Sequence, residues 1–302
     1  MVSEEESSDV YVKMEKCSHE VFIEEICENC EQHIDTICSF KLGYIHKDYT
    51  VSTEERDRLR FFCLKKMMEK KKLYLILDLD HTLVHSVRTN QLSSDELLIE
   101  TDSMQDIANG CLFKLELVEM VTKLRPFVRT FLKEASDLYE MYIYTRGNLA
   151  YAYNIVKLLD PENKYFGARV ITRDACGEEH GKSLDRVLAA ENAVVILDDL
   201  QAAWTKHLQN LILIKKFFYF EFGNNGVTSP AALKEESKTD LGLVAVLNLL
   251  QQIHQGFFAG DADADFKGRD VRQVMNRLRE EICCPERRVK QKRIQAEEFI
   301  PL

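Results

Sequence analysis

Five short apolar runs between residues 73 and 214 are the strongest pattern in this chain. Each run is continuous rather than alternating, which is typical of a strand that is buried on both faces of a parallel sheet. The runs are Leu73–Leu77, Tyr139–Tyr144, Arg169–Thr172, Ala193–Leu197 and Leu211–Ile214. The pattern therefore predicts five strands of one buried sheet.

The stretches between these runs have apolar residues at helical spacing. The predicted helices are Pro126–Leu138, with proline at the first helical position, Leu149–Leu159 and Ser183–Ala190. Strands that alternate with helices indicate an α/β fold, a parallel sheet with flanking helices. Two more helices, Asp240–His254 and Asp270–Cys284, follow, and the second belongs to a helical C-terminal extension.

Changes in composition divide the chain into five parts. They are an acidic leader expected to be flexible (1–16), a Cys/His segment (17–50), a linking helix (51–67), a predicted catalytic domain (68–254), and a loop, helix and basic tail (255–302). Ser52-Thr53-Glu54-Glu55 resembles a capping box, which predicts that the linking helix begins there.

Charge and hydropathy exclude several classes of protein. Nine acidic and two basic residues lie within residues 1–30, so this segment carries −7 of the net charge of −10. The nearly neutral remainder argues against direct, sequence-independent nucleic-acid binding. The apolar run Leu241–Leu250 is too short to cross a bilayer, and the N-terminus lacks the apolar segment of a secretory signal. We expect a soluble, intracellular protein without a membrane partner. The nine scattered cysteines predict no disulfide framework.

Acidic residues follow two of the predicted buried strands. Asp78 and Asp80 come after the first strand, and Asp198 and Asp199 end the fourth. Ligands bind at the carboxyl ends of the strands in such sheets. Burying carboxylates without a cation is costly, so we disfavour the alternative that they are only loop acids or helix caps. Converging carboxylates are suited to Mg²⁺, and one of them could attack phosphorus.

Two other residues would complete a phosphate site. Thr145 ends the second strand and supplies a hydroxyl, and Lys182 opens the helix predicted before the Asp198 strand and supplies a cation. These groups would hold phosphoryl oxygens as charge redistributes. Lys182 alone would be interpreted as a solvated residue; in this order of motifs we interpret it as part of the site.

This order of motifs resembles that of the haloacid dehalogenase-like phosphatases, which have a Rossmannoid fold. More closely, five segments are similar to the phosphatases of the RNA polymerase II carboxy-terminal domain (CTD): Leu77–Ser86, Lys123–Pro126, Tyr144–Asn148, Lys182–Asp185 and Leu197–Asp199. The similarity covers residues 68–254. Trp204–His207 and Asn210–Ile212 resemble the transcription-factor-IIF-associating type.

The resemblance implies a role for each matching residue. Asp78 would be the nucleophile and a Mg²⁺ ligand, and Asp80 the general acid and base, with its backbone carbonyl on the metal. Thr82 would order the Asp loop. Arg125, Thr145 and Lys182 would bind the phosphoryl group. Asp199 would complete the metal site. Asp198 would belong to the same metal site, behind the direct ligands or bound to the metal through water, and spacing alone does not rank it against Asp199. His81 and His85 are interpreted as packing or loop residues.

Some features depart from the family pattern. Arg146 stands where methionine is frequent, and Leu200 where threonine is more usual; both could alter substrate preference without removing a catalytic group. The chain ends soon after Cys284, so we expect no BRCT domain of the kind that large members carry. The short spacings around Thr145 leave no room for a cap domain, and an open site suits an extended phosphopeptide.

A cluster of cysteine and histidine residues that could bind a metal precedes the predicted catalytic domain. Cys17, His19, Cys27 and Cys30 have a spacing that can close a tetrahedral Zn²⁺ site, with His33 and Cys38 as spare ligands. The alternative is reduced thiols in a poorly ordered leader. Because this segment lies outside residues 68–254, we expect turnover to survive its loss.

The sequence thus predicts a Mg²⁺-dependent protein serine/threonine phosphatase that acts on the phosphorylated CTD of RNA polymerase II. General transcription factors are further candidate partners, and the expected location is the nucleus. The basic tail Arg287–Arg293 is either an import signal or the solvated end of a helix. Two alternatives stay open: the same chemistry on another phosphoprotein, or a non-catalytic phosphopeptide-binding module.

Overall fold

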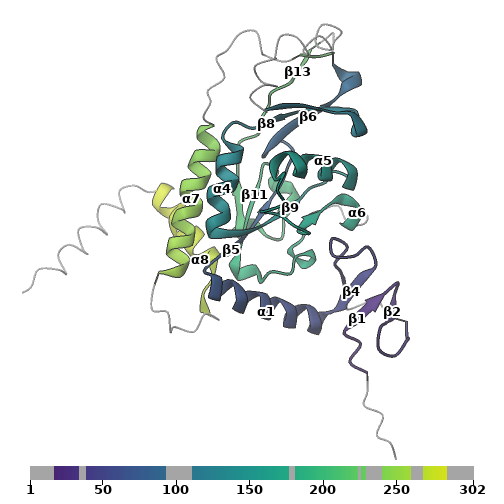
Figure 1. Cartoon of the computed structure of the whole chain (residues 1–302). Coiled ribbons are helices and arrows are strands. Elements are labelled where there is room, and N and C mark those ends of the chain that lie inside the picture. The colour runs from purple at the N-terminus through teal and green to yellow at the C-terminus, as the bar shows by residue number, and fades with distance from the viewer. Residues whose placement is uncertain are drawn as a thin grey trace, which may run out of the picture.

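A five-stranded, all-parallel sheet lies at the centre of the molecule (Figure 1). The computed structural model describes residues 17–33, 39–92, 111–176, 181–223, 226–228, 240–259 and 268–283. The strands, in the order β10-β9-β5-β11-β12, are β10 (Val170–Ile171), β9 (Tyr139–Tyr144), β5 (Leu73–Leu77), β11 (Val194–Asp198) and β12 (Leu211–Leu213). The predicted α/β fold with a parallel sheet is confirmed.

Burial of β5 on both faces explains its uninterrupted apolar sequence. All five of its residues are buried, as are all five of β11. Leu77 pairs with Ile143 of β9 on one side and with Leu197 of β11 on the other. This register ends the three strands at nearly the same level, so the residues that follow them meet at one edge of the sheet.

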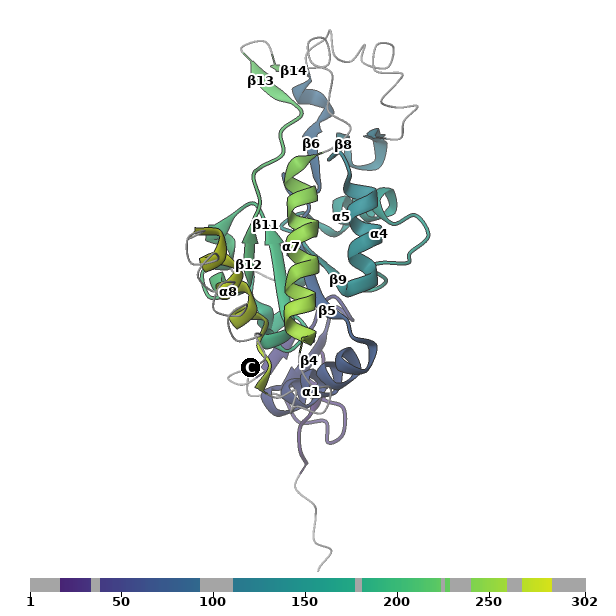
Figure 2. The same ribbon diagram turned by 90° about the vertical axis from the view of Figure 1, so that its left-hand side faces the viewer.

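Helices cover both faces of this sheet. Figures 1 and 2 show α4 (Val128–Leu138) and α7 (Leu241–Phe258) side by side on one face, with α8 (Val271–Cys283) next to α7. Helix α5 (Leu149–Leu159) lies on the opposite face, near the short α6 (Arg173–Cys176). No helix among the described residues is long and apolar enough to cross a membrane.

One predicted helix begins later than expected and another is not an α-helix. Pro126 does not open α4, because Phe127 adopts a left-handed conformation with φ of 70° and the helix begins at Val128. Ser183–Ala190 is not an α-helix and contains only a 3₁₀ turn, Leu184–Arg186. The Ser183 hydroxyl accepts a hydrogen bond from the amide of Asp185, a local bond that competes with helix formation.

The stretch between Thr82 and Thr145 carries a second, antiparallel sheet. Its strands are β6 (Val84–Arg88), β8 (Met120–Leu124) and β7 (Leu112–Leu115), in that order across the sheet. A 3₁₀ turn, Glu116–Val118, connects β7 to β8. Figure 1 shows this sheet above the parallel one, close to the short hairpin β13 (Glu221–Gly223) and β14 (Gly226–Thr228). The described residues of this stretch form no separate domain.

An N-terminal antiparallel sheet precedes the central fold. Its strands are β1 (Val21–Ile23), β2 (Ile26–Cys27), β3 (Ser39–Lys41) and β4 (Tyr49–Ser52), in the order β2-β1-β4-β3. Helix α1 (Thr53–Lys70) follows directly, and the Ser52 hydroxyl caps it by accepting from the Glu55 amide at 3.2 Å. The other half of the predicted capping box is not formed, because the Ser52 amide donates to the Glu20 carbonyl. The predicted leader 1–16, Cys38 and the tail Arg287–Arg293 lie outside the described residues.

Candidate active site

Asp78 occupies the centre of the edge where the parallel strands end. It follows β5, the middle strand, and its amide donates to the carbonyl of Leu197 on β11 at 3.0 Å. The side chain is buried. Burial, opposed by Lys182 and reinforced by Asp198, raises the pKa of Asp78 to about 7. This pKa already includes the effect of a neighbouring cation, which favours the ionised carboxylate against the cost of burial.

Lys182 supplies that cation. Its ammonium lies 2.5 Å from Oδ1 of Asp78 and 2.6 Å from Oδ2 of Asp198, and its side chain is buried with them. Burial alone would lower the pKa of Lys182, but the two carboxylates together raise it. The structure thus brings together three residues that the sequence analysis assigned to one site.

Asp198 is held from several directions. Its Oδ2 also accepts from the Trp204 indole at 2.8 Å, and its Oδ1 accepts from the Leu200 amide at 2.8 Å. Asp199 lies next to it and accepts from the Thr82 hydroxyl at 3.2 Å. Thr82 therefore ties the loop after Asp78 to the acidic pair, and its role in ordering that loop for catalysis stays a prediction.

The carboxylates of Asp78, Asp198 and Asp199 fit a divalent cation. One oxygen from each lies within 4.8 Å of the others, so all three can reach a common point. An all-oxygen set of this kind suits a hard cation such as Mg²⁺. The Asp80 side chain is not part of this set, and the role of its carbonyl as a ligand stays a prediction.

Asp80 is bound instead by a residue that the sequence analysis missed. The Tyr151 hydroxyl on α5 donates to Oδ1 of Asp80 at 2.6 Å and lies 2.8 Å from the Ser86 hydroxyl. The pKa of Asp80 is raised, mainly by burial, and the hydrogen bond from Tyr151 acts in the opposite direction. No sequence signal links Tyr151 to Asp80, because the two residues are 71 positions apart.

Thr145 directly follows β9, as Asp78 directly follows β5. It is buried, and its hydroxyl accepts from the amide of Gly147 at 2.9 Å. A Cβ at Gly147 would lie 2.5 Å from the Tyr151 ring and 3.3 Å from the Thr145 hydroxyl. Only glycine therefore permits this close turn beside Thr145 and Tyr151.

Arg125 makes different contacts from those expected of a phosphate ligand. Its guanidinium donates to the carbonyl of Thr82 at 3.0 Å and to Asp240, which caps α7, at 2.5 Å. Both contacts tie helix α7 to the loop after Asp78. Binding of the phosphoryl group by Arg125 stays a prediction.

His81 and His85 hold the segment that follows β12. His81 and Phe217 contact each other twice, since the His81 carbonyl accepts from the Phe217 amide and the His81 ring lies 3.0 Å from the Phe217 carbonyl. Nδ1 of His85 accepts from the amides of Tyr219 and Phe220. Burial, assisted by His81, lowers the pKa of His85 to about 4. These contacts agree with the interpretation of both histidines as packing or loop residues.

The two departures from the family pattern lie at exposed positions. Arg146 follows Thr145 and is exposed, and Leu200 is 38% exposed beside the acidic pair. Neither side chain replaces a member of the buried cluster. Their effect on substrate preference stays a prediction.

The four predicted zinc ligands come together in the N-terminal sheet. Sγ of Cys17 lies 3.7 Å from Sγ of Cys27, Sγ of Cys30 lies 3.5 Å from Nδ1 of His19, and all four ligand atoms lie within 4.8 Å of one another. Burial opposes ionisation of Cys27, but hydrogen bonds from the amides of Asn29 and Cys30 and from His19 lower its pKa to about 6. The predicted spare ligand His33 lies outside this group.

Comparison with known proteins gives a consistent result. Residues 73–253 match the model of the NLI interacting factor-like phosphatase family. The chain is 42% identical over 278 residues to RNA polymerase II C-terminal domain phosphatase-like 4 of Arabidopsis thaliana, which covers 88% of this chain and 62% of that relative. It is 28% identical to a human RNA polymerase II C-terminal domain phosphatase, over 75% of this chain and 24% of that relative. The chain thus spans less than two thirds of these relatives.

Solved structures share the fold. The structure of Fcp1, described as an essential RNA polymerase II CTD phosphatase, superposes with a TM-score of 0.59 at 24% identity, covering 74% of this chain and 75% of that chain. The beryllium fluoride-bound form of the fission yeast enzyme gives a TM-score of 0.60 at 22% identity, with the same shares of each chain.

Proposed function

Because the chain belongs to the NLI interacting factor-like phosphatase family, we propose that it is a Mg²⁺-dependent protein serine/threonine phosphatase acting on the phosphorylated CTD of RNA polymerase II. The observation that carries this proposal is the buried cluster of Asp78, Lys182 and Asp198 at the carboxyl edge of the sheet. The names of its relatives support the choice of substrate.

The proposed reaction has two steps. Oδ of Asp78 attacks phosphorus, the bond between phosphorus and the serine or threonine oxygen breaks, and Asp80 donates its proton to the departing oxygen. Asp80 then accepts a proton from water as that water attacks the aspartyl-phosphate, which releases inorganic phosphate and regenerates the Asp78 carboxylate. The raised pKa of Asp80 favours the protonated form that the first step needs.

The other residues of the site position the phosphoryl group and stabilise its charge. Lys182 and Thr145 would bind the phosphoryl oxygens, and Tyr151 would keep the Asp80 carboxyl turned toward its hydroxyl. Asp78, Asp199 and Asp198 would hold Mg²⁺, with the Asp80 carbonyl as a further ligand. When bound, Mg²⁺ neutralises charge that develops on the phosphoryl oxygens.

The proposal is tested with CTD heptad peptides that each carry one phosphoserine or phosphothreonine. The full chain should release phosphate from at least one of them in Mg²⁺, and Asp78→Asn should release none. Hydrolysis of a generic aryl phosphate without hydrolysis of any CTD peptide would favour another phosphoprotein substrate. Binding of a CTD peptide by folded protein that turns over neither compound would favour the non-catalytic module.

We further propose that Cys17, His19, Cys27 and Cys30 bind one structural Zn²⁺. Three sulfur ligands and one imidazole form the kind of set that zinc prefers, and the lowered pKa of Cys27 favours its thiolate. Elemental analysis of freshly purified, reduced protein should find one zinc per chain. The double variant Cys27→Ser/Cys30→Ser should contain none, whereas the control Cys63→Ser, a cysteine on α1, should retain it.

The same proposal places the protein in the nucleus, with general transcription factors as further partners. The relatives whose names refer to RNA polymerase II support this location. Cell fractionation should recover the chain with chromatin-associated polymerase. Recovery in the cytosol alone would contradict the proposed location.

A further inference from the structure

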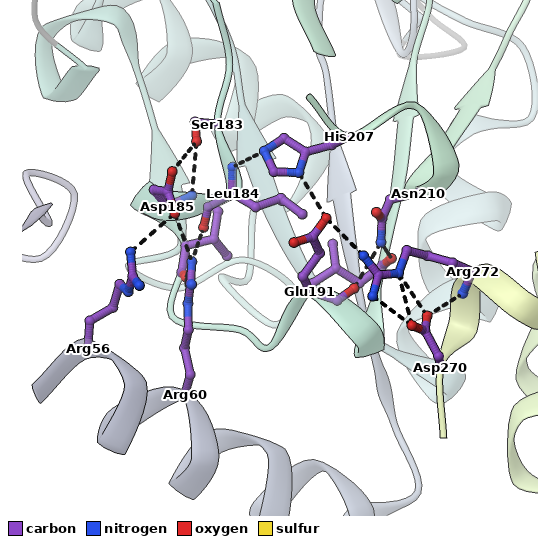
Figure 3. A network of polar contacts seen from close by, with 12 residues as sticks. Arg56, Arg60, Ser183, Leu184, Asp185, Glu191, His207, Asn210, Asp270 and Arg272 are labelled. Atoms are coloured by element: carbon purple, nitrogen blue, oxygen red, sulfur yellow. Dashed lines mark hydrogen bonds and ion pairs between the residues drawn. The ribbon is translucent and has the colours of Figure 1, made fainter. Parts of the chain in front are cut away.

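The loop that carries Lys182 is held by residues from outside the matched phosphatase domain. The family match begins at residue 73, and helix α1 ends before it. Nevertheless, two arginines of α1 reach the turn directly after Lys182 (Figure 3). Helix α1 therefore contacts the chain within two residues of the catalytic lysine.

Arg60 binds the backbone of this turn. Its guanidinium donates to the carbonyl of Leu184 and, at 3.3 Å from both Nε and Nη2, to the carbonyl of Val187. These two carbonyls flank the 3₁₀ turn Leu184–Arg186. One planar guanidinium with several fixed donors therefore holds both ends of the turn at once.

Arg56 adds a contact from the same face of α1. Its Nη1 donates to Oδ1 of Asp185 at 3.2 Å, while the other carboxylate oxygen of Asp185 accepts from the Ser183 hydroxyl at 2.9 Å. The Arg56 guanidinium also lies 3.7 Å from the centre of the Phe40 ring on β3. The N-terminal sheet, Arg56 and the residues next to Lys182 thus form one connected set of contacts.

The opposite side of the turn is fixed independently. The Leu184 amide donates to Nε2 of His207 at 3.2 Å, and the other ring nitrogen of His207 lies 3.1 Å from Glu191 (Figure 3). Arg272 of α8 pairs with Glu191 at 3.3 Å. The turn is therefore held between α1 on one side and the His207–Glu191 pair on the other.

We propose that Arg60, assisted by Arg56, is a positioning residue for Lys182, so that helix α1 is a working part of the catalytic site. The Lys182 amide donates to the Ala203 carbonyl at 2.8 Å, and the contacts of the turn begin at the next residue. Displacement of Leu184 and Asp185 therefore moves the lysine backbone, and with it the ammonium that contacts Asp78. This inference rests on the proposed phosphatase function, in which Lys182 binds the phosphoryl group.

The consequence of losing these contacts should appear in kcat. A displaced Lys182 can still bind the phosphate group of the substrate, so KM should change little. It is no longer aligned with the phosphoryl oxygens on which charge develops in the transition state, so kcat should fall. Displacements near 1 Å cost up to ~10²-fold in rate, so Arg60→Ala should lower kcat by roughly 10- to 100-fold with KM altered less than about threefold. Arg60→Lys keeps the charge but cannot hold both carbonyls, so its kcat should be intermediate.

The matched control is Arg58→Ala on the same helix. Arg58 pairs with the buried Glu55, three residues earlier on α1, through two hydrogen bonds. Its removal weakens α1 while leaving the contacts of Arg60 in place, so kcat should stay within about twofold of the original. A fall in kcat confined to the Arg60 variants thus separates positioning of Lys182 from general destabilisation.

The experiment measures kcat and KM for the four proteins with one phosphopeptide, together with amide hydrogen exchange of residues 182–188. Arg60→Ala should speed exchange in this segment and leave β11 protected. Equal kcat in Arg60→Ala and the original chain, or equal losses in the Arg60 and Arg58 variants, would overturn the inference. If the original chain has no activity, the proposed function fails, and unchanged exchange in Arg60→Ala and Arg60→Lys would then refute the positioning contact separately.

Discussion

The two clusters that can hold a metal ion are assembled in opposite ways. At the edge of the parallel sheet, Asp78 and Asp198 are far apart in sequence and meet because the buried strands β5 and β11 end at the same level. At the N-terminal sheet, all four ligands lie between Cys17 and Cys30. Only Cys27 is on a strand, the two-residue β2, and the segment has few buried residues. The first site is held by a hydrophobic core; the second has little core of its own.

This difference predicts how each cluster responds to loss of its ligands. A site built on buried strands should keep its shape when a ligand is changed, so that chemistry is lost before the fold is. A site within a short, poorly buried segment should unfold when its ligands are changed, because metal binding and folding are then the same event. The following experiments test this contrast, from the largest expected effect to the smallest.

Asp78→Asn should abolish turnover and leave the fold intact. An amide is a poor nucleophile and also removes a charged metal ligand, so kcat should fall by ~10⁴-fold or more. Steady-state kinetics with a phosphopeptide and circular dichroism of the same sample measure the two effects. Unfolding of this variant would contradict the claim that the core alone shapes the site, and undiminished hydrolysis would show that Asp78 is not the nucleophile.

Asp80→Asn should slow the reaction less and retain the ability to form the aspartyl-phosphate. Loss of general acid–base catalysis typically costs ~10²–10⁴-fold. With a phosphate donor that has a good leaving group, protonation matters least, so the phosphorylated enzyme should accumulate. Mass spectrometry after acid quenching should find the phosphoryl group on the peptide containing Asp78; an adduct on Ser86 or His85 would reassign the nucleophile.

Cys27→Ser/Cys30→Ser should lose the N-terminal sheet and spare the central one. Hydrogen exchange should become fast in the described residues before α1 and stay slow in β5, β9 and β11. Because Arg60 does not depend on the sheet for its contacts, kcat should fall by less than about tenfold. Retained protection of β1 and β4 would show that this sheet needs no metal, and a larger loss of kcat would show that it acts on Lys182 more strongly than α1 does.

Lowering the pH should reduce the free energy of unfolding through His85, and this effect should be smaller than those of the substitutions above. In the unfolded chain His85 binds a proton below about pH 6.5. In the folded state the buried ring stays neutral down to about pH 4, which is its pKa there. The free energy of unfolding should therefore decrease between about pH 6.5 and pH 4, by the order of 1–3 kcal/mol, and change little from this group below that range. Urea unfolding of the original chain and His85→Gln measures it: the difference between the two should vary with pH, and a constant difference would contradict the assignment.

The parts of the fold that were predictable are those where local sequence and burial agree. β5 and β9 have the predicted bounds because uninterrupted apolar residues have few alternatives to burial on both faces. The residues after these strands were predictable for the same reason, since parallel strands bring their carboxyl ends together. Asp78, Thr145 and Asp198 could therefore be assigned to one edge of the sheet from strand ends alone. Lys182 follows none of these strands, and only the order of motifs assigned it to the same site.

The parts that were not predictable depend on distant contacts or unusual turns. Nothing near Tyr151 or Arg60 indicates that they bind Asp80 or the turn after Lys182, because both partners are remote in sequence. The hairpin between β1 and β2 turns at Glu24 and Glu25, both with positive φ, where Asn-Gly would be the usual signal. Ser183–Ala190 has helical spacing, yet the local bond of Ser183 and the bonds from Arg60 and His207 to the backbone favour a 3₁₀ turn.

The central position of β5 also has a consequence for synthesis of the protein. β5 is the first strand of its sheet to leave the ribosome, yet its neighbour β9 begins only at Tyr139, and β11 later still. At ~5–20 residues per second, the apolar sequence of β5 waits roughly 3–12 s for its first partner. A chaperone that shields extended apolar segments should therefore be needed most at this stage, and the strand that leads into Asp78 is the one most exposed to aggregation.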